Sequence, residues 1–276
     1  IRALAVVVIA LMESPELRGQ QDDAERKAWN VPVAPFHIIG NVHYVGAAGV
    51  SAFLIVTTEG SILLDGGLPE TAPLIVRNIE ALGFRLRDVK FLINSHAHYD
   101  HAGGLAELKR LTGAVMIASG PDASALSAGA RDMPAIVIDR VVDDGDTVQL
   151  ANTTLTAHVT PGHTKGCTTW TMTTSDGVKP YRVLFYCSTS VVDRLVGNTG
   201  YPQIVIDYEH TFKRLRTMSA DVFLANHPGF FGMEQKRKAM TSGAANPFVD
   251  SGELQRFVTT SERDFRDVLA RESQSR

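Results

Sequence analysis

The chain concentrates its most reactive side chains in one short stretch, SHAHYDH at residues 95–101. Imidazole and carboxylate groups are suitable ligands for zinc, and a thiolate is not required beside them. His96 and His98 are two residues apart, so an extended segment directs their side chains to the same side. Asp100 and His101 follow where the chain turns into a predicted helix, and there neighbouring side chains diverge. One loop therefore presents two pairs of ligands to two adjacent metal positions.

Two further histidines stand in turns that follow predicted strands. His163 lies in PGHT after the alternating segment TLTAHVT, and His227 lies in NHPG after DVFLAN. Turns at strand ends can meet at one rim of a pair of sheets, where binding sites are commonly built. Three protein ligands for each of two zinc ions leave room for a shared water, which is a catalytic rather than a structural arrangement. The full set of candidate ligands is His96, His98, Asp100, His101, His163 and His227.

Composition restricts the class of protein and its partners. The chain has 276 residues, of which 44% are hydrophobic and 21% charged, as in ordinary globular proteins. Its 27 basic and 30 acidic residues give a net charge of −3, which offers no electrostatic case for nucleic acid as the partner. Two cysteines are too few for a disulfide scaffold or a Cys-rich zinc site. We expect a monomer that binds a small molecule and neither nucleic acid nor membrane.

The N-terminal segment resembles a secretory signal. Ten apolar residues, Ala3–Met12, follow a single positive charge, and they are too few to span a bilayer. The alternative is a buried N-terminal strand or helix, but the polar stretch 13–27 favours a signal. We therefore expect residues 1–20 to be a signal remnant and tail, residues 21–276 to form a single domain, and the protein to work in the periplasm.

Short predicted strands alternate with helices beyond Trp29. Two β-rich halves, each bordered by helices, predict an α/β (α+β) fold in which two sheets pack face to face with helices outside. No GxGxxG, P-loop or GxSxG motif is present. The expected strands are 36–46, 51–58, 61–67, 90–94, 114–119, 135–139, 147–150, 154–160, 167–174, 181–187 and 221–226, and the expected helices are 69–84, 101–111, 207–218, 232–241 and 260–272.

The segments HAHYDH, PGHTKG and NHPG, in this order and spacing, resemble the metallo-β-lactamase superfamily. The resemblance covers essentially all of residues 35–276. It implies an αββα sandwich of two mixed β-sheets with the site at one edge. The ligands that it implies are His96, His98 and His163 for the first zinc, and Asp100, His101 and His227 for the second.

The segment LFYCSTS at 184–190 narrows the activity that the resemblance implies. Glyoxalase II and the lactonases carry a bridging Asp after this strand, whereas this chain has no carboxylate there. The first subclass of class B β-lactamases has a Cys ligand, but we align Ser188 rather than Cys187 with it. A Ser at this position beside His and Asp ligands is similar to the third subclass. That similarity implies that Ser188 and Ser190 hold the substrate carboxylate, unless their hydroxyls only satisfy backbone groups of the turn.

The implied activity is that of a dizinc β-lactamase. Such an enzyme would hydrolyse the amide bond of penicillins, cephalosporins and carbapenems with a zinc-bound hydroxide, which Asp100 orients. The alternative enzyme is a dizinc hydrolase of lactones, thioesters or phosphoesters in the same superfamily. A metal-binding module without catalysis is a third hypothesis, and six intact candidate ligands disfavour it.

The remaining Cys, Asp and His residues have less specific interpretations. Cys167 and Cys187 flank the predicted hairpin symmetrically, so a disulfide and a pair of small buried side chains both remain open. Asp65 ends a predicted strand near the rim, and we expect it to order the ligand loops rather than to bind metal. The histidines expected to be structural or exposed are His37, His43, His158 and His210.

Overall fold

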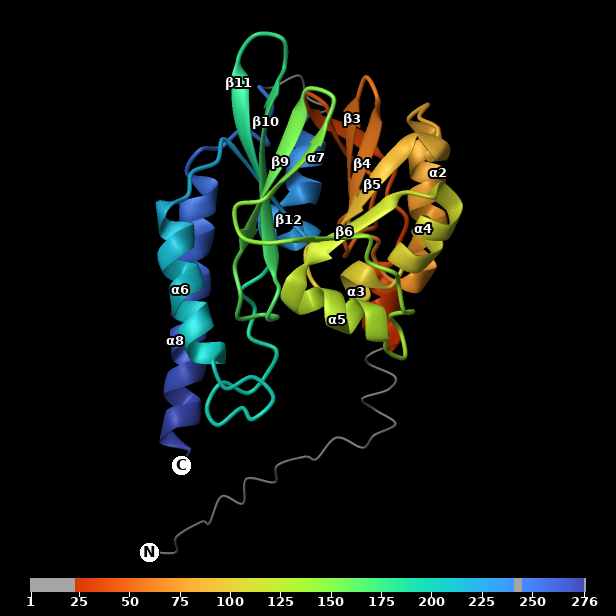
Figure 1. The fold of residues 1–276 in the computed structure, drawn as a ribbon. Helices are drawn as coiled ribbons and strands as arrows, with labels where there is room; N and C mark the ends of the chain where they lie inside the picture. Colours follow the sequence, from red (N-terminus) through yellow and green to blue (C-terminus); the bar gives the residue numbers. More distant parts are fainter. Residues whose placement is uncertain (1–22, 241–244, 276) are drawn as a thin grey trace, which may run out of the picture.

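The computed structural model describes residues 23–240 and 245–275 (Figure 1). The expected signal segment, residues 1–20, lies outside the described residues, and so does the beginning of the predicted domain at residue 21. Within the described ranges, no helix combines the length and the hydrophobicity that crossing a bilayer requires.

The N-terminal half forms a mixed sheet of seven strands. Their order in the sheet follows their order along the chain. The pairs from β1 to β4 are antiparallel, and those from β4 to β7 are parallel. The strands are β1 (Phe36–Ile39), β2 (Val42–Tyr44), β3 (Phe53–Thr57), β4 (Gly60–Leu64), β5 (Val89–Ile93), β6 (Val115–Ser119) and β7 (Arg140–Val142).

The C-terminal half forms a second mixed sheet of five strands, in the order β12-β11-β10-β9-β8. Its pairs are antiparallel except for β11 and β12, which run parallel. The strands are β8 (Thr147–Leu150), β9 (Thr153–Val159), β10 (Thr168–Ser175), β11 (Pro180–Tyr186) and β12 (Val222–Ala225).

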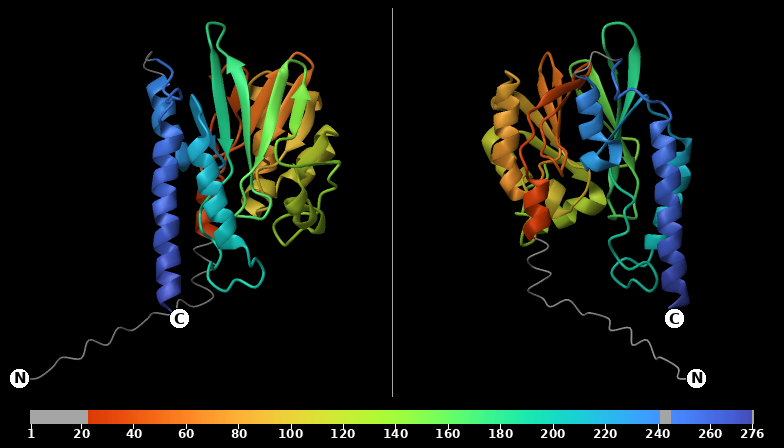
Figure 2. Two further views of the ribbon diagram at one scale, coloured as in Figure 1. Left: turned by 60° about the vertical axis from the view of Figure 1, so that its left-hand side comes forward. Right: turned by 180° about the vertical axis from the view of Figure 1, so that it is seen from behind.

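Helices cover the outer faces of both sheets, which confirms the expected αββα sandwich. Figures 1 and 2 show α2 and α4 beside the first sheet, and α6 and α8 beside the second. The α-helices whose bounds both lie within the described residues are α2 (Ala72–Ala81), α3 (Tyr99–Ala102), α4 (Leu105–Thr112), α5 (Gly120–Ala128), α6 (Ile204–Thr217), α7 (Met233–Met240) and α8 (Glu253–Gln274). The described part of the chain also contains three short 3₁₀ helices, η1 (Pro69–Thr71), η2 (Leu86–Asp88) and η3 (Pro228–Phe231).

Successive side chains along the strands of the first sheet pack alternately into two separate cores. In β3, Phe53 and Ile55 belong to the core that the two sheets share, whereas Leu54 packs in the core under α2 and α4. Successive side chains of a strand point to opposite faces, so a continuous apolar strand serves two cores. The first sheet is therefore buried on both faces.

Glycines divide two elements that the sequence predicts to be continuous. The predicted strand 36–46 is a hairpin of β1 and β2, because Gly40 turns the chain with a φ of 53° and a Cβ there would lie 2.1 Å from Thr174 Oγ1. The predicted helix 101–111 is divided into α3 and α4 at Gly103 and Gly104. A Cβ on Gly104 would lie 2.2 Å from the carbonyl oxygen of Gly66, so only glycine fits this close approach.

Other elements also differ from the prediction. Residues 135–139 are not a strand, since the amide of Ile136 donates to the carbonyl of Leu126 at the end of α5. Helix α5 itself was not expected. Helix α8 begins at Glu253, well before the predicted start at residue 260.

A disulfide joins Cys167 to Cys187, which decides between the two alternatives that the sequence left open. The bond connects the residue before β10 to the residue after β11, and the two Cα atoms are 5.9 Å apart. It therefore closes the end of the central hairpin of the second sheet.

Candidate metal centre

The candidate ligands extend from loops and from the short helix α3 at the same end of both sheets. Four of them follow β5 of the first sheet, and the other two follow strands β9 and β12 of the second. Ligand-bearing segments from the two halves of the molecule thus meet where the halves adjoin. The residues that the structure brings together there are His96, His98, Asp100, His101, His163 and His227.

The first group consists of His96, His98 and His163. Nε2 of His96 lies 3.2 Å from Nε2 of His163. The His98 ring lies 4.6 Å from the His163 ring and 4.7 Å from the His96 ring, measured between centroids. One ring nitrogen from each of the three residues lies within 4.8 Å of the others. His96 and His163 are buried, and His98 is half-buried.

The second group consists of Asp100, His101 and His227. Nε2 of His101 lies 3.2 Å from Nε2 of His227. Oδ2 of Asp100 lies 3.0 Å from His101 Nε2 and 3.4 Å from His227 Nε2. The two groups are adjacent, because the rings of His96 and His101 are only 4.6 Å apart.

The hydrogen bonds behind the rings determine which nitrogens face the centre as acceptors. Nδ1 of His163 lies 2.7 Å from the carbonyl oxygen of Ser190, and Nδ1 of His227 lies 2.8 Å from that of Gly49. A carbonyl only accepts, so each Nδ1 donates its proton, and Nε2 of the neutral ring carries a lone pair. These Nε2 lone pairs point toward a centre that other imidazole nitrogens also face, and zinc requires such an arrangement of ligands. The donor set therefore fits a metal ion.

Burial and charge hold most of these groups in their metal-binding protonation states. Desolvation moves the pKa of His96 well below its ordinary value and lowers that of His163 to about 3. Burial disfavours the Asp100 carboxylate, but the facing His101 ring more than offsets this, so the pKa of Asp100 is lowered. His101 differs, because burial lowers its pKa while the carboxylates of Asp100 and Asp65 together raise it by more. Neutral imidazole and ionised carboxylate are the forms that coordinate zinc.

Asp65 lies behind the first ligand loop, where the sequence led us to expect an ordering role. Its side chain is fully buried, and its Oδ1 accepts hydrogen bonds from the Ser95 amide at 2.7 Å and from Asn94 Nδ2 at 3.0 Å. These two residues directly precede His96. The contacts agree with the expected ordering role.

Asp122, in the first turn of α5, was missed by the sequence analysis. Its Oδ2 accepts from the amide of Ala97 at 2.9 Å and from Thr164 Oγ1 at 2.8 Å, and its Oδ1 accepts from the amide of Gly166 at 2.8 Å. Ala97 lies in the first ligand loop, and the other two donors lie in the His163 loop. One buried carboxylate thus joins both loops. The only signals for it in the sequence were Pro121 and an acidic residue at a helix start.

The two serines proposed to bind substrate differ in exposure. Ser188 is buried, and its Oγ accepts a hydrogen bond from the Ser190 amide at 3.1 Å. Ser190 is exposed, and its carbonyl also accepts from Tyr208 Oη at 2.8 Å, besides the bond from His163. Ser188 therefore supports the turn, while Ser190 is the exposed residue of the two.

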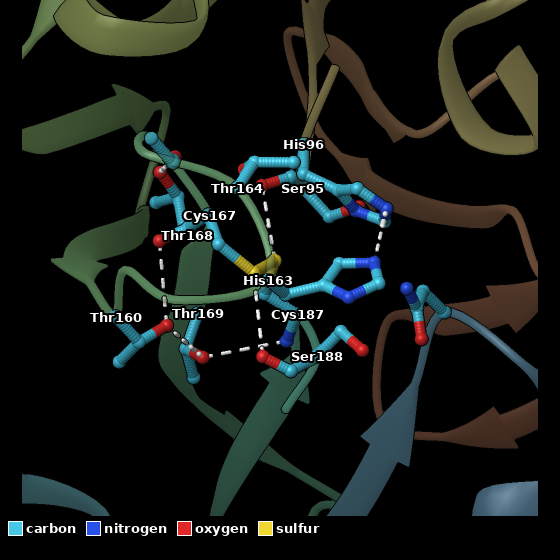
Figure 3. The surroundings of a disulfide bond; sticks show 12 residues. Ser95, His96, Thr160, His163, Thr164, Cys167, Thr168, Thr169, Cys187 and Ser188 are labelled. Carbon is cyan, nitrogen blue, oxygen red and sulfur yellow. Dashed lines mark hydrogen bonds between the residues drawn. A yellow bond between two sulfur atoms is a disulfide. The ribbon is translucent and has the colours of Figure 1, made fainter. Parts of the chain in front are cut away.

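The disulfide lies directly beside the first group of ligands. Figure 3 shows Cys167 and Cys187 close to His163, Ser95 and Ser188. The amide of Thr168, next to Cys167, donates to the carbonyl of Ser95 at 2.8 Å. The disulfide therefore connects the His163 loop to the β11 end that continues into the serines.

The other four histidines do not join the centre. The rings of His37 and His43 face each other on the β1–β2 hairpin at 5.1 Å. His158 bonds to Thr171 Oγ1 at 2.7 Å, and His210 is exposed. The expectation that these residues are structural or exposed agrees with these positions.

Comparison with known proteins places this fold and site in one family. The chain matches the metallo-β-lactamase superfamily over residues 45–227. The structure of BJP-1, a subclass B3 metallo-β-lactamase of Bradyrhizobium japonicum, is 43% identical with a TM-score of 0.87, and the match covers 90% of this chain and 98% of that one. For FEZ-1 from Legionella gormanii the identity is 37%, the TM-score 0.86 and the coverage 88% and 98%. The chain belongs to the metallo-β-lactamase superfamily.

A curated relative with a different activity is also similar. The hydroxyacylglutathione hydrolase of Rhodospirillum rubrum is 35% identical over 98 residues. This match covers 36% of the chain and 34% of the relative, so it spans about a third of that protein. The superfamily is thus established, whereas its members differ in substrate.

Proposed function

We propose that this protein is a zinc-dependent hydrolase and, specifically, a dizinc β-lactamase acting on penicillins, cephalosporins and carbapenems. The observation that carries the proposal is the pair of imidazole contacts, His96–His163 and His101–His227, each 3.2 Å between Nε2 atoms. Similarity to subclass B3 structures over nearly their whole length supports the choice of substrate.

Two zinc ions are proposed for each chain. A bound zinc ion would polarise a carbonyl and lower the pKa of water to about 7, which is chemistry that can hydrolyse an amide. The residues that would hold the first ion are His96, His98 and His163, and those that would hold the second are Asp100, His101 and His227.

The side chains of the centre have separate tasks in this proposal. Asp100 keeps its carboxylate ionised and offers Oδ2 as a hydrogen-bond acceptor that can orient a water. The carbonyls behind His163 and His227 hold both rings in fixed orientations. The exposed Ser190 hydroxyl donates to the carboxylate of the substrate, and Ser188 holds the amide of Ser190 in place.

The alternative function is a dizinc hydrolase of lactones, thioesters or phosphoesters. The similarity to a hydroxyacylglutathione hydrolase favours a thioester among these substrates. The segment 184–190 argues against it, because it offers no carboxylate between the two groups of ligands.

Parallel assays distinguish the two functions. The zinc-loaded protein is offered a carbapenem, an acyl-homoserine lactone and a glutathione thioester, each with and without a chelator. We expect hydrolysis of the carbapenem, its loss with the chelator and its recovery with added zinc. Zinc-replete protein that leaves penicillins and carbapenems intact contradicts the proposal.

Replacing the proposed catalytic carboxylate is the most direct mutational test. We expect Asp100→Asn to lower kcat for the carbapenem by about 100-fold or more, since the amide is a poor proton acceptor. The exposed Asp267 on α8 supplies the control, and Asp267→Asn should leave kcat unchanged. Zinc content, measured by metal analysis of both variants, separates loss of metal from loss of a proton acceptor. Unchanged turnover by Asp100→Asn rules out its catalytic role.

We also propose that residues 1–20 direct export to the periplasm and that residues 21–276 form one domain. An oxidising compartment suits the Cys167–Cys187 disulfide. Cell fractionation and the mass of the mature chain test the export, and an uncleaved chain in the cytosolic fraction contradicts it.

A further inference from the structure

Three buried groups beside the hydrolytic centre have the composition of a second kind of metal site. The sulfur atoms of Cys167 and Cys187 and a ring nitrogen of His96 all lie within 4.8 Å of one another. All three residues are at most 1% exposed. Figure 3 shows the sulfurs next to the ligand loops. In the disulfide the sulfurs are bonded to each other, so His96 is the only free ligand of the three.

Reduction converts the two sulfurs into ligands. A small dithiol supplies two electrons and two protons, and its two thiols become a disulfide. The Cys167–Cys187 bond breaks, and the sulfur of each cysteine takes up one proton. Both protons leave again when the thiolates bind a metal ion. With zinc–sulfur bonds of about 2.3 Å, two thiolates on one ion lie about 3.8 Å apart. The Cα separation of 5.9 Å is compatible with that distance.

The backbone around the cysteines is held independently of the disulfide. The amide of Thr160 donates to the Cys167 carbonyl at 2.7 Å, and the amide of Cys187 donates to Thr169 Oγ1 at 3.3 Å. The antiparallel pairing of β10 and β11 also extends to Trp170 and Phe185, close to both cysteines. Reduction therefore leaves the two thiols facing each other near His96.

We propose that the dithiol form of the chain holds a soft metal ion between Cys167, Cys187 and His96, and that the disulfide closes this site. Two thiolates and an imidazole favour zinc, cadmium or copper(I). Because His96 also belongs to the first group of proposed zinc ligands, the thiolate site withdraws it from His163. Only this competition rests on the proposed function, since the thiolate site itself requires no hydrolysis.

Cobalt(II) provides a test that does not depend on activity. The chain is folded with a dithiol under anaerobic conditions, desalted and titrated with cobalt(II), and circular dichroism checks its fold. We expect a thiolate-to-cobalt charge-transfer band in the near ultraviolet that saturates with one ion in this site, and a thiol assay that finds both cysteines free. The oxidised chain and the Cys167→Ser/Cys187→Ser variant should bind cobalt without the band.

His96→Ala tests the third ligand. Loss of an outer hydrogen-bond partner of a ligand already costs about 10- to 100-fold in metal affinity, so loss of the ligand should weaken the thiolate site at least as much. A folded dithiol chain without the band overturns the proposal, and so does a band of equal affinity in His96→Ala. A dithiol chain that does not fold overturns it as well. None of these readouts changes if the substrate is not a β-lactam.

Discussion

At the residue scale, the Asp122 carboxylate connects two ligand loops that are distant in the sequence. It accepts two backbone amides and one hydroxyl and is only 4% exposed. Burial raises the pKa of Asp122, although the donors around it oppose that shift. A group in this position ties the His96 loop to the His163 loop through residues next to the ligands.

Replacement of this carboxylate should therefore loosen the centre. In Asp122→Asn one oxygen becomes an NH2 group that faces a donor, so the expected loss of stability is about 1–3 kcal/mol. We expect zinc affinity to fall about 10- to 100-fold, as for other outer partners of metal ligands. Urea unfolding and competition with a zinc chelator measure the two effects, with Asp267→Asn as the exposed control. Unchanged zinc affinity would show that the loops do not need this link.

Spacing in the sequence was informative for the candidate ligands but not for the residues that hold the ligand loops in place. The motif residues are recognisable because imidazoles rarely gather at such short separations. Asp122 has no comparable signal, since its three donors come from positions that only the folded chain brings together. For the same reason the sequence could not decide whether Cys167 and Cys187 form a disulfide, because symmetric spacing about a turn does not determine whether two sulfurs meet.

At the element scale, a buried carboxylate joins the two helices that cover the second sheet. Glu262 on α8 accepts from Arg216 Nε on α6 at 2.6 Å, and from Arg266 Nη2 on α8 at 2.7 Å. The Glu262 side chain is 10% exposed, whereas both arginine side chains are about half exposed. Burial opposes the charge on Glu262, but the two arginines more than offset it and lower its pKa.

A carboxyl whose folded-state pKa is lowered stabilises the fold above its unfolded-state pKa, and this stabilisation disappears as the pH falls through the folded-state value. At neutral pH we expect the free energy of unfolding of the wild type to exceed that of Glu262→Gln by about 1 kcal/mol. The expected difference is small because the arginines are exposed to solvent, which weakens the ion pairs. The difference should begin to fall near the ordinary pKa of 4.5 and vanish below the lowered folded-state pKa. Urea unfolding across this range measures it. Glu234→Gln, on the exposed Glu234–Lys238 pair, should show little change, and a constant difference for Glu262→Gln would contradict the ion-pair origin.

The two packed sheets and most of their strands could be predicted from the sequence pattern, whereas the order of the strands and several elements could not. The apolar segment 135–139 resembles a strand, but its amide at Ile136 bonds to the last turn of α5 instead of a neighbouring strand. Val137 in the same segment is 71% exposed. Helix α5 has only Leu126 as a large apolar buried residue, so its sequence lacks the hydrophobic periodicity that would predict a helix. Tertiary contacts, not local pattern, determine these elements.

At the scale of the whole molecule, the proposed metal centre connects the two sheets. Ligands from the β5 end meet ligands that follow β9 and β12. A metal that binds only the folded chain stabilises it by about 2.7 kcal/mol at 100 times its Kd. Removing it should therefore lower the free energy of unfolding of the whole sandwich rather than of one loop.

We expect a chelator to lower Tm by about 5–10 °C, because 1 kcal/mol shifts Tm by about 2–4 °C in proteins of roughly this size. Calorimetry before chelation, after it and after zinc is restored measures the shift. His163→Ala is the matched variant, and the chelator should change its Tm by less. An equal Tm with and without zinc would contradict the proposed contribution of the metal to stability.

The agreement between strand order and chain order in the first sheet has a consequence for synthesis. Strands β1 to β7 pair as they emerge, so the N-terminal layer can assemble from neighbours in sequence. Four candidate ligands belong to that early layer, but His163 and His227 are synthesised only later. The centre is therefore incomplete until the last strand, β12, has joined its sheet. Metal uptake then reports the completion of both sheets, and a nascent chain that stalls midway has only four of the six candidate ligands, two for each proposed metal position.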